Sequence, residues 1–446
     1  IRSADHGDSA EDSSKVSLLI GYLVSAPVKD MLKIESYNMI DLARIAVLIA
    51  CVGLLYSPSV GTVGLVGAVA AFLASGQVVV RLKRVLSRPS VTWAILFLGM
   101  VLIGTFYASV PWAVRWMDLF KWRTILWFVL VLAIFDERRW RERLLIMFLV
   151  GTAVGAIASS AAAAGWITLW RPPENLLRIS GTQGMAFACA ALICAWAILE
   201  TELVGQVPWV WPLLGVVYVT NIVFVTDSRS GYAILGLGLC VLLSWKASWR
   251  GRSLIVAGLL LALSLALAVS PRMYGKVQLA VTEWAHESEL EDLTSFGIRR
   301  VWYLNTVEVI GEHWLVGVGT GGFPDAYREH IAGKYPADDW RSLATTDPHN
   351  QYLGIFAQQG IGGFVVFLAW LVAVGRDRSG PPVYRNLAVA ILCGWCVTSL
   401  FSSHFRTFVE GHLLATFLGV FLAAESPPQP EQEPPVEPNI IQGAAG

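Results

Sequence analysis

The sequence predicts an all-α polytopic membrane protein of about 12 transmembrane helices. Hydrophobic residues make up 55% of the 446 residues and charged residues only 15%, whereas a soluble domain carries about 25% charged residues. The charges gather in short gaps between long uncharged segments, a pattern typical of a chain that crosses a bilayer repeatedly. The formal net charge is zero, so the composition does not indicate a nucleic-acid-binding protein.

The individual spans follow from the apolar segments, since about 20 apolar residues cross a bilayer as a helix. The predicted spans are residues 39–56, 58–80, 91–108, 120–135, 144–163, 182–200, 208–225, 230–246, 253–270, 350–374, 386–404 and 408–424. Residues 16–28 are apolar but short, so we predict an interfacial helix in contact with membrane lipids there. The N-terminal residues before it are acidic, unlike the start of a signal peptide.

Basic residues in the short gaps predict the orientation. Lys and Arg are concentrated in four gaps, which are residues 81–88, 138–143, 246–252 and 376–385. If twelve spans are counted, all four gaps fall on one side of the membrane, whereas a single miscounted span would separate them. Because cytoplasmic loops are enriched in Lys and Arg, this side is predicted to be cytoplasmic, with both termini on it.

One outward connection is much longer than the others. Between the ninth and tenth predicted spans it contains an acidic stretch, residues 283–292, and then a plausible amphipathic helix, residues 298–311. A loop of this length in a compact protein is usually functional. The chain thus divides into five parts, which are a cytoplasmic N-terminus (1–38), spans 1–9 (39–270), a periplasmic loop domain (271–349), spans 10–12 (350–424) and a disordered Pro-rich tail (425–446).

The residues that could take part in catalysis or binding lie on the predicted outward face. They are Arg178, Arg229, Arg299, Arg300 and His349. Arg229 either caps the membrane edge and pairs with Asp227, or clamps an anion such as phosphate through its planar guanidinium; for Arg300 a solvated helix face is the simpler interpretation. His349 either begins a helix by bonding to backbone or acts as a general base, because imidazole has an ordinary pKa of about 6.5.

Other histidines and two short motifs carry less weight. His404 and His412 flank the last outward turn and are interpreted as interfacial. Residues 317–322 fit G-x-G-x-x-G, but no strand precedes them, so we interpret them as a flexible turn that returns the loop helix to the bilayer. Residues 393–396 fit C-x-x-C inside a predicted span and indicate helix packing. No metal-ligand set is evident, and no cofactor is expected.

Several of these residues form a pattern that resembles a known family. His349 and Asn350, followed after nine residues by Gly360 and Gly363, resemble the hallmark of the O-antigen ligase and polymerase superfamily. Residues 299–323 and 226–231 resemble further segments of that family, so the motifs cover about residues 215–375. There are two departures, since Trp314 stands where the family often has Pro, and Ser230 is inserted before the Gly of the Ser-Arg-Gly-type corner.

The resemblance implies a metal-independent, inverting glycosyltransferase with a GT-C-type helical fold in the bacterial inner membrane. Such an enzyme takes O-antigen glycan from undecaprenyl diphosphate at the periplasmic face and passes it to a sugar hydroxyl of lipid A–core. His349 matches the catalytic histidine, Arg229 and Arg299 match the essential arginines, and Arg178 and Arg300 are weaker candidates for the same diphosphate site.

Three alternatives remain open. An O-antigen polymerase and a protein O-oligosaccharyltransferase belong to the same superfamily, and the sequence barely separates them from a ligase. A secondary transporter is the alternative from another class, because transporters also have many spans. Transporters usually show internal repeats and polar groups near the bilayer midplane, whereas here the long loop follows the ninth span and the charges gather at the membrane faces.

Overall fold

The computed structural model describes residues 38–200, 208–226, 228–271, 273–275, 278, 282 and 295–425. The predicted interfacial helix 16–28, the acidic stretch 283–292 and the tail beyond residue 425 lie outside the described residues. Within the described residues the protein is helical, with no strand. The prediction of an all-α membrane protein is therefore confirmed at the level of a helical, multi-pass chain.

The helices follow one another with short connections. They are α2 (Met39–Tyr56), α3 (Pro58–Ala74), α4 (Val78–Leu86), α5 (Pro89–Tyr107), α6 (Trp112–Lys121), α7 (Arg123–Ile134), α8 (Arg138–Ala163), α9 (Ser180–Leu199), α10 (Val210–Phe224), α11 (Arg229–Ser244), α12 (Trp249–Val269), α14 (Ser295–His313), α15 (Phe323–Ile331), α16 (Gln351–Arg376), α17 (Pro382–Thr398) and α18 (Phe408–Leu422), with 3₁₀ turns at Pro173–Asn175 and Trp340–Ser342.

Every predicted span overlaps a helix, but α17 ends at Thr398, before the end of the predicted span 386–404, and the structure does not confirm the number of spans. Six described helices are long and apolar enough to cross a membrane, and the bent pair α3 and α4 would make seven. The predicted span 58–80 is broken because the chain turns by 106° between these two helices, where Gly76 takes a left-handed φ of 68°. The predicted span 120–135 contains only the short α7, preceded by the separate α6.

The four basic gaps meet at one end of the bundle. Arg81 binds Asp136 with Nη1–Oδ2 3.0 Å, the Arg141 guanidinium lies 5.8 Å from the Tyr384 ring, and that of Arg385 lies 5.7 Å from the Trp245 ring. Asp136 and Trp245 lie just before the second and third gaps, so the contacts bring the four gaps together at one end of the bundle. That this end is cytoplasmic stays a prediction.

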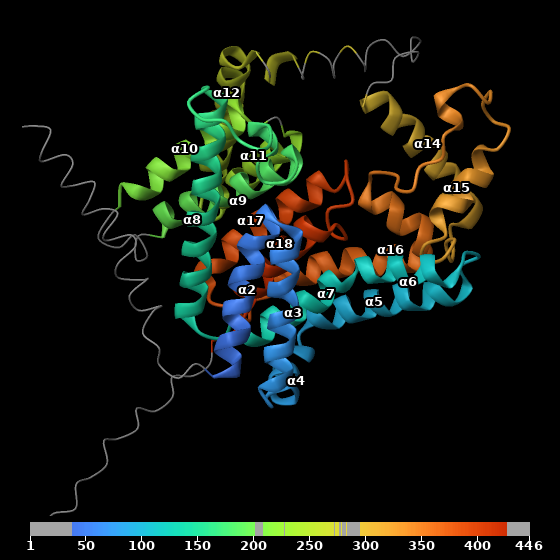
Figure 1. Cartoon of the computed structure of the whole chain (residues 1–446), viewed down its shortest axis with the longest axis horizontal. Helices are drawn as coiled ribbons and strands as arrows, with labels where there is room; N and C mark the ends of the chain where they lie inside the picture. The colour runs from blue at the N-terminus through green and yellow to red at the C-terminus, as the bar shows by residue number, and fades with distance from the viewer. Residues whose placement is uncertain are drawn as a thin grey trace, which may run out of the picture.

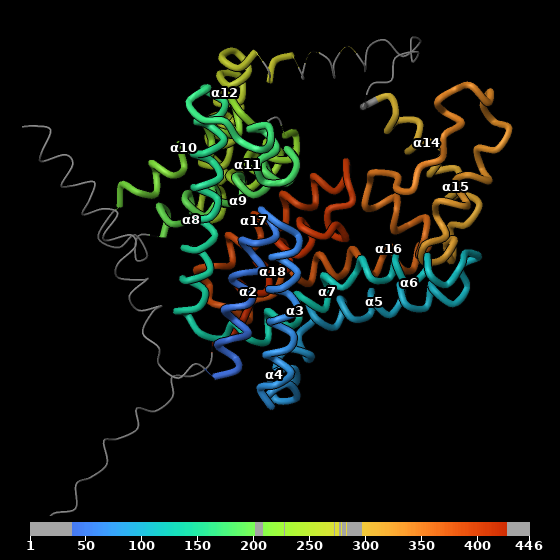
Figure 2. The backbone as a smooth tube through the Cα atoms, viewed as in Figure 1, coloured from blue at the N-terminus to red at the C-terminus, as the bar shows by residue number. Residues whose placement is uncertain are grey.

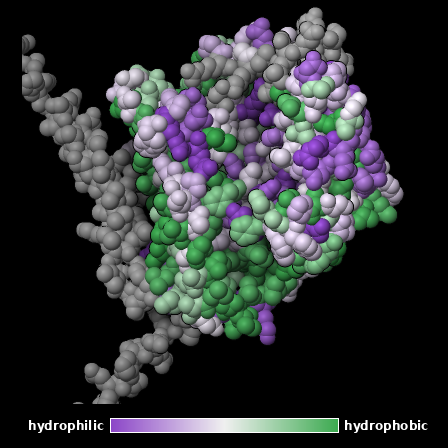
Figure 3. Space-filling view, turned by 45° about the vertical axis from the view of Figure 1, so that its right-hand side comes forward, coloured by the Kyte–Doolittle hydropathy of each residue, from purple (hydrophilic) through white to green (hydrophobic). Residues whose placement is uncertain are grey.

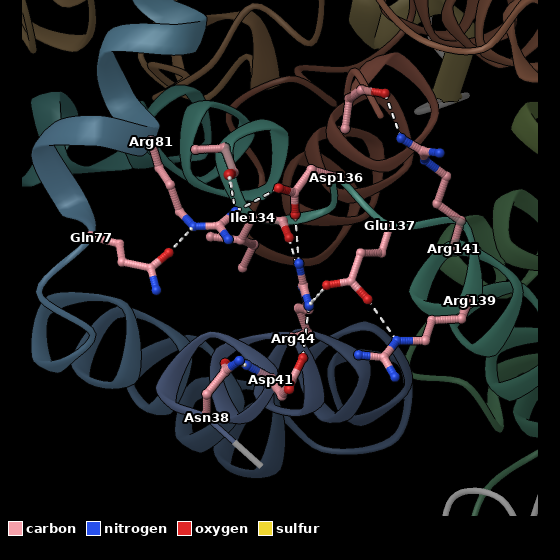
Figure 4. A network of polar contacts seen from close by, with 12 residues as sticks. Asn38, Asp41, Arg44, Gln77, Arg81, Ile134, Asp136, Glu137, Arg139 and Arg141 are labelled. Carbon is pink, nitrogen blue, oxygen red and sulfur yellow. Dashed lines mark hydrogen bonds and ion pairs between the residues drawn. The ribbon is translucent and has the colours of Figure 1, made fainter. Parts of the chain in front are cut away.

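A buried cation holds this end together. Arg44 is 1% exposed and binds Asp41 at 2.7 Å, Asp136 at 2.5 Å and Glu137 at 2.6 Å. Its Nε donates to the Ile134 carbonyl at 2.7 Å, and Figure 4 shows these partners converging from two parts of the chain. A buried charge needs such complete pairing, because desolvation would otherwise be costly.

The opposite end carries α14 and α15. They lie at the upper right of the molecule, above α16 and far from α4 at the bottom (Figure 1), and the tube shows the chain passing between them and α16 (Figure 2). Figure 3 shows hydrophilic side chains gathered over the upper part, around a hollow, with mostly hydrophobic ones below. Between the ends, every residue of α18 from Val409 to Leu422 is buried, so this helix forms the centre of the bundle.

Candidate active site

The site begins at the turn that precedes α16. Asn350 is the N-cap of this helix, and its side-chain oxygen accepts from the Tyr352 and Leu353 amides at 3.0 and 3.1 Å. Asn caps a helix well because its side chain satisfies amides that have no partner within the helix. The predicted motif residue Asn350 therefore has a structural task, which is to fix where α16 starts and where His349 lies.

His349 has an unusual backbone. Its φ is 54°, and among the described non-glycine residues only Arg178, with φ 78°, is also left-handed. This conformation is uncommon outside glycine, and residues held in it cluster at functional sites. The His349 amide donates to Asp347 Oδ1 at 2.7 Å, which stabilises the turn. Both left-handed residues belong to the predicted site.

Helix α14 covers the His349 side chain. The Trp302 ring stacks on the imidazole with centroids 5.0 Å apart and planes 16° apart, and the Tyr303 hydroxyl donates to the His349 carbonyl at 3.1 Å. Arg299, one turn earlier on α14, acts electrostatically on His349. Burial first, and then Arg299 and Arg406, lower the pKa of His349 below its ordinary value, although Asp347 opposes them. The imidazole is therefore neutral near pH 7.

Asp347 links this turn to the α17–α18 loop. Its carboxylate accepts from Arg406 Nη2 at 2.6 Å and from Ser403 Oγ at 2.9 Å. Burial disfavours the charged carboxylate, but the charge and hydrogen bonds of Arg406, together with the His349 amide and Ser403, outweigh it and hold the pKa of Asp347 below its ordinary value. The buried Arg406 also reaches Asp118 of α6 at 3.2 Å, so it bridges two carboxylates.

The motif glycines shape the backbone behind the turn. Gly360 has φ 62° and ψ −169° and breaks α16, and a Cβ there would lie closer than 3.0 Å to the Leu315 carbonyl. A Cβ on Gly363 would clash with Gln359 in the same way. Only glycine adopts this backbone region readily. The residues 360 and 363 therefore bend the helix and allow close packing.

The segment 317–322 packs against this kink. Val318 and Gly319 donate amides to the Ala357 and Gln358 carbonyls at 2.9 and 3.0 Å, and Thr320 donates to the Gly104 carbonyl at 3.0 Å. The prediction of a turn is confirmed, but the turn is not a free one, because its backbone is bound to α16 and α5. The sequence alone could not predict these contacts, since they join segments that are distant in the sequence.

Arg178 and Arg229 lie in a second group, at the N-termini of α9 and α11. These helices touch where Gly184 faces Ser228 and Gly231, and Gln183 Nε2 donates to Thr226 Oγ1 at 2.9 Å. Arg229 is exposed and Arg178 is half-buried. Asp227, the alternative partner of Arg229, lies outside the described residues. The structure thus brings Arg299 to His349, whereas no contact joins Arg178 or Arg229 to either of them in the described chain.

One segment of the chain matches a known protein family. Residues 214–368 match the family model described as O-antigen ligase. This segment is an O-antigen ligase family domain. It contains Arg229, Arg299, His349 and both motif glycines, and runs from α10 into α16. No curated protein matches the chain. The match supports an enzyme of the ligase and polymerase group at the level of the family, and this family implies lipid-linked glycans and lipid acceptors as substrates in general.

Part of the candidate site lies outside the matched segment, and sequence reasoning missed it. His404 and His412 were predicted to be interfacial, but they are buried, with exposed fractions of 7% and 2%. Arg406 and Asp118 stand 288 residues apart in sequence and pair only through the fold. The one available signal was the presence of charged residues in two short outward gaps, which must be neutralised if the gaps are buried.

Arg300 is the last of the predicted arginines, and it lies on α14. Arg300 is half-buried beside Arg299 on α14, and it is not among the groups that shift the pKa of His349. In the described part of the chain no group of three or more His, Cys, Asp or Glu side chains could hold a metal ion. The cations near His349 are therefore the guanidinium groups of Arg299 and Arg406.

Proposed function

We propose that the protein transfers an O-antigen glycan from undecaprenyl diphosphate to a sugar hydroxyl of lipid A–core, at the periplasmic face of the inner membrane. The observation that carries the proposal is the neutral His349, held in a left-handed turn beside Arg299. The family assignment of residues 214–368 supports it. We also propose that the helices follow the GT-C-type arrangement of such enzymes.

In this mechanism His349 acts as a general base. A sugar hydroxyl is a weak nucleophile, and a neutral imidazole within hydrogen-bond reach takes its proton as the new glycosidic bond forms. The hydroxyl oxygen attacks the anomeric carbon from the side opposite the diphosphate, so the configuration is inverted in one displacement. The stacked Trp302 and the capped helix keep the imidazole in place, which lowers the entropic cost of reaching the transition state.

The arginines stabilise the leaving diphosphate. Arg299 forms no ion pair with any described residue, so its donors remain available for an anion beside His349. Arg178 and Arg229 also form no ion pair in the described chain, but they lie in the second group, so their part in binding the diphosphate stays a prediction from the sequence. Guanidinium groups bind phosphate oxygens in pairs and stabilise the charge that develops as the sugar–phosphate bond breaks. Arg406 does not serve this purpose, because Asp347 and Asp118 already occupy it. Fixed cations supply the charge that a metal ion supplies elsewhere, so we propose metal-independent transfer.

Complementation of a deletion strain tests this function. Gel analysis of lipopolysaccharide should show glycan attached to the core with the wild-type chain and none with His349→Ala, while membrane extracts contain equal amounts of both proteins. If the deletion strain attaches a single repeat unit, the enzyme is a polymerase rather than a ligase. Normal attachment by His349→Ala would refute the base role, and loss of transfer in EDTA would refute metal independence.

A further inference from the structure

His404 is a buried histidine whose ring forms no hydrogen bond with the described residues. It lies in the loop between α17 and α18, it is 7% exposed, and neither ring nitrogen has a partner in the described chain. A buried polar group without a partner destabilises the folded protein, because it loses its hydrogen bonds to water. A phenyl ring would fill the same space without that cost, so packing alone does not explain the imidazole at this position.

Charged groups from three other elements act electrostatically on this imidazole. They are Glu410 on α18, Asp347 before α16 and Arg299 on α14. On its own loop, Arg406 is bound to Asp347 and Asp118. The charge of Asp347 is thus largely compensated. Glu410 is buried, and its side chain accepts a hydrogen bond from Thr182 but has no cationic partner in the described residues. Glu410 is therefore the carboxylate that most favours a proton on His404.

Two effects oppose that proton in the free protein. Burial is the larger, and the charge of Arg299 is the other; together they keep the pKa of His404 below its ordinary value despite Glu410 and Asp347. Burial is a fixed property of the site. The field of Arg299 is not fixed, because its guanidinium forms no ion pair within the described chain and an arriving anion would compensate it.

We propose that His404 takes up one proton from solvent when the diphosphate donor binds to Arg299. The proposal rests on the proposed function of Arg299 as a donor ligand. No covalent bond other than N–H forms, and the proton compensates part of the negative charge brought by the donor. Protonation also adds a positive charge that acts on the buried Glu410, which has no cationic partner among the described residues.

His349 is the less favourable acceptor for this proton. Its nearest carboxylate is Asp347, which Arg406 and Ser403 already bind, and both Arg299 and Arg406 oppose a charge on it. His404 instead has Glu410. A proton on His404 adds a further positive charge near the site and so keeps His349 neutral, as a general base must be. In this proposal His404 takes up the proton on donor binding, and His349 removes the proton from the acceptor hydroxyl.

Calorimetric titration tests the proposal with the full chain in detergent and, as the probe, undecaprenyl diphosphate that carries a sugar. Because both ends of this diphosphate are esterified, the probe lacks the terminal phosphate proton that would itself titrate at about pH 6. Binding enthalpies in two buffers of different ionisation enthalpy at pH 7 report proton uptake. The wild type should take up a proton, and its Kd should tighten as pH falls from 8 to 6, by at most about tenfold per pH unit for one linked proton. His404→Phe should bind without uptake and with a Kd that does not vary over this range, and His349→Gln should retain uptake.

Controls separate the outcomes. His412→Phe replaces another buried histidine, on α18, and should leave uptake unchanged. If His404→Phe does not fold, His404→Gln serves instead, because it cannot be protonated. Uptake that persists in either His404 variant, or that is lost in His349→Gln, overturns the proposal. Binding by the wild type without uptake overturns it while the proposed function stands, whereas no binding of the glycosylated undecaprenyl diphosphate by the wild type refutes both.

Discussion

The chemistry at His349 depends on three neighbouring charges that act in different directions. Arg299 and Arg406 disfavour the imidazolium and Asp347 favours it, while burial adds the largest contribution and decides the sign. A base with a lowered pKa is fully unprotonated at neutral pH, although it is intrinsically weaker than an ordinary histidine. This lowered pKa therefore suits a reaction whose barrier depends more on stabilising the leaving group than on the strength of the base.

The pH dependence of transfer follows from this shift. Because the pKa of His349 lies below its ordinary value, kcat/KM of His404→Phe, which lacks the proton linked to donor binding, should stay constant from pH 8 down through about 6.5 and fall only below that, as the imidazole becomes protonated. His349→Ala should reduce kcat/KM by about 10²–10⁴ and remove this acidic limb. Steady-state transfer assays across the pH range measure both, and a limb at or above the ordinary value would contradict the assigned environment.

At this scale the sequence predicted the residues of the local motifs but not their partners. His349, Asn350 and Arg299 belong to a recognisable pattern, and the structure places His349 and Arg299 together. Asp347, Arg406, Asp118, His404 and Glu410 come from segments without such a pattern. A charge pair between distant loops depends on how helices pack, which no local spacing in one sequence encodes.

At the scale of elements, the positions of the helices were predictable and their breaks were not. Apolar runs located every helix within the membrane region, because length and hydrophobicity are local properties. The bend between α3 and α4 and the kink in α16 depend on single glycines whose φ values are set by their neighbours. Glycine alone does not predict a bend, since helical glycines such as Gly375 lie within straight segments.

The kink in α16 should be sensitive to a single methyl group. Gly360→Ala places Cβ against the Leu315 carbonyl in a backbone region reserved for glycine, so it should destabilise the protein by about 1–3 kcal/mol. Gly375→Ala is the matched control on the same helix, because its Cβ would lie 3.9 Å from Leu392, and it should be neutral or slightly stabilising. Thermal unfolding in detergent compares them, and equal melting temperatures would contradict the kink.

At the scale of the whole molecule, the bridge from Asp118 through Arg406 to Asp347 joins α6, the α17–α18 loop and the start of α16. These elements contribute both to the bundle and to the site. A buried cation shared by two carboxylates fixes their relative positions, since any separation would leave a charge unpaired in a poorly solvated place. The position of His349 is thus set by contacts that span the chain.

Asp347→Asn should weaken this bridge, with a cost of about 1–3 kcal/mol because Asp118 remains bound to Arg406. The sign with pH follows from the lowered pKa of Asp347: its stabilisation is complete above the ordinary carboxyl value of about 3.9 and is lost as pH falls through the lowered pKa. Unfolding of the variant and wild type at pH 7 and pH 3 measures this, and their difference should shrink at the lower pH. Asp325→Asn removes an exposed pair with Arg328 and should cost little at either pH.

Orientation in the membrane decides whether the assembled site can meet a periplasmic substrate. The basic gaps gather at the end that contains Arg84, while Arg328 lies on α15 at the other end. In a background with the native cysteines replaced, a membrane-impermeant maleimide should label Arg328→Cys in cells with a permeabilised outer membrane and label Arg84→Cys only after lysis. These two exposed arginines differ in which end they occupy, so each serves as the control for the other. The reverse labelling pattern would place Arg299 and His349 toward the cytoplasm, where a glycan presented at the periplasmic face cannot reach them.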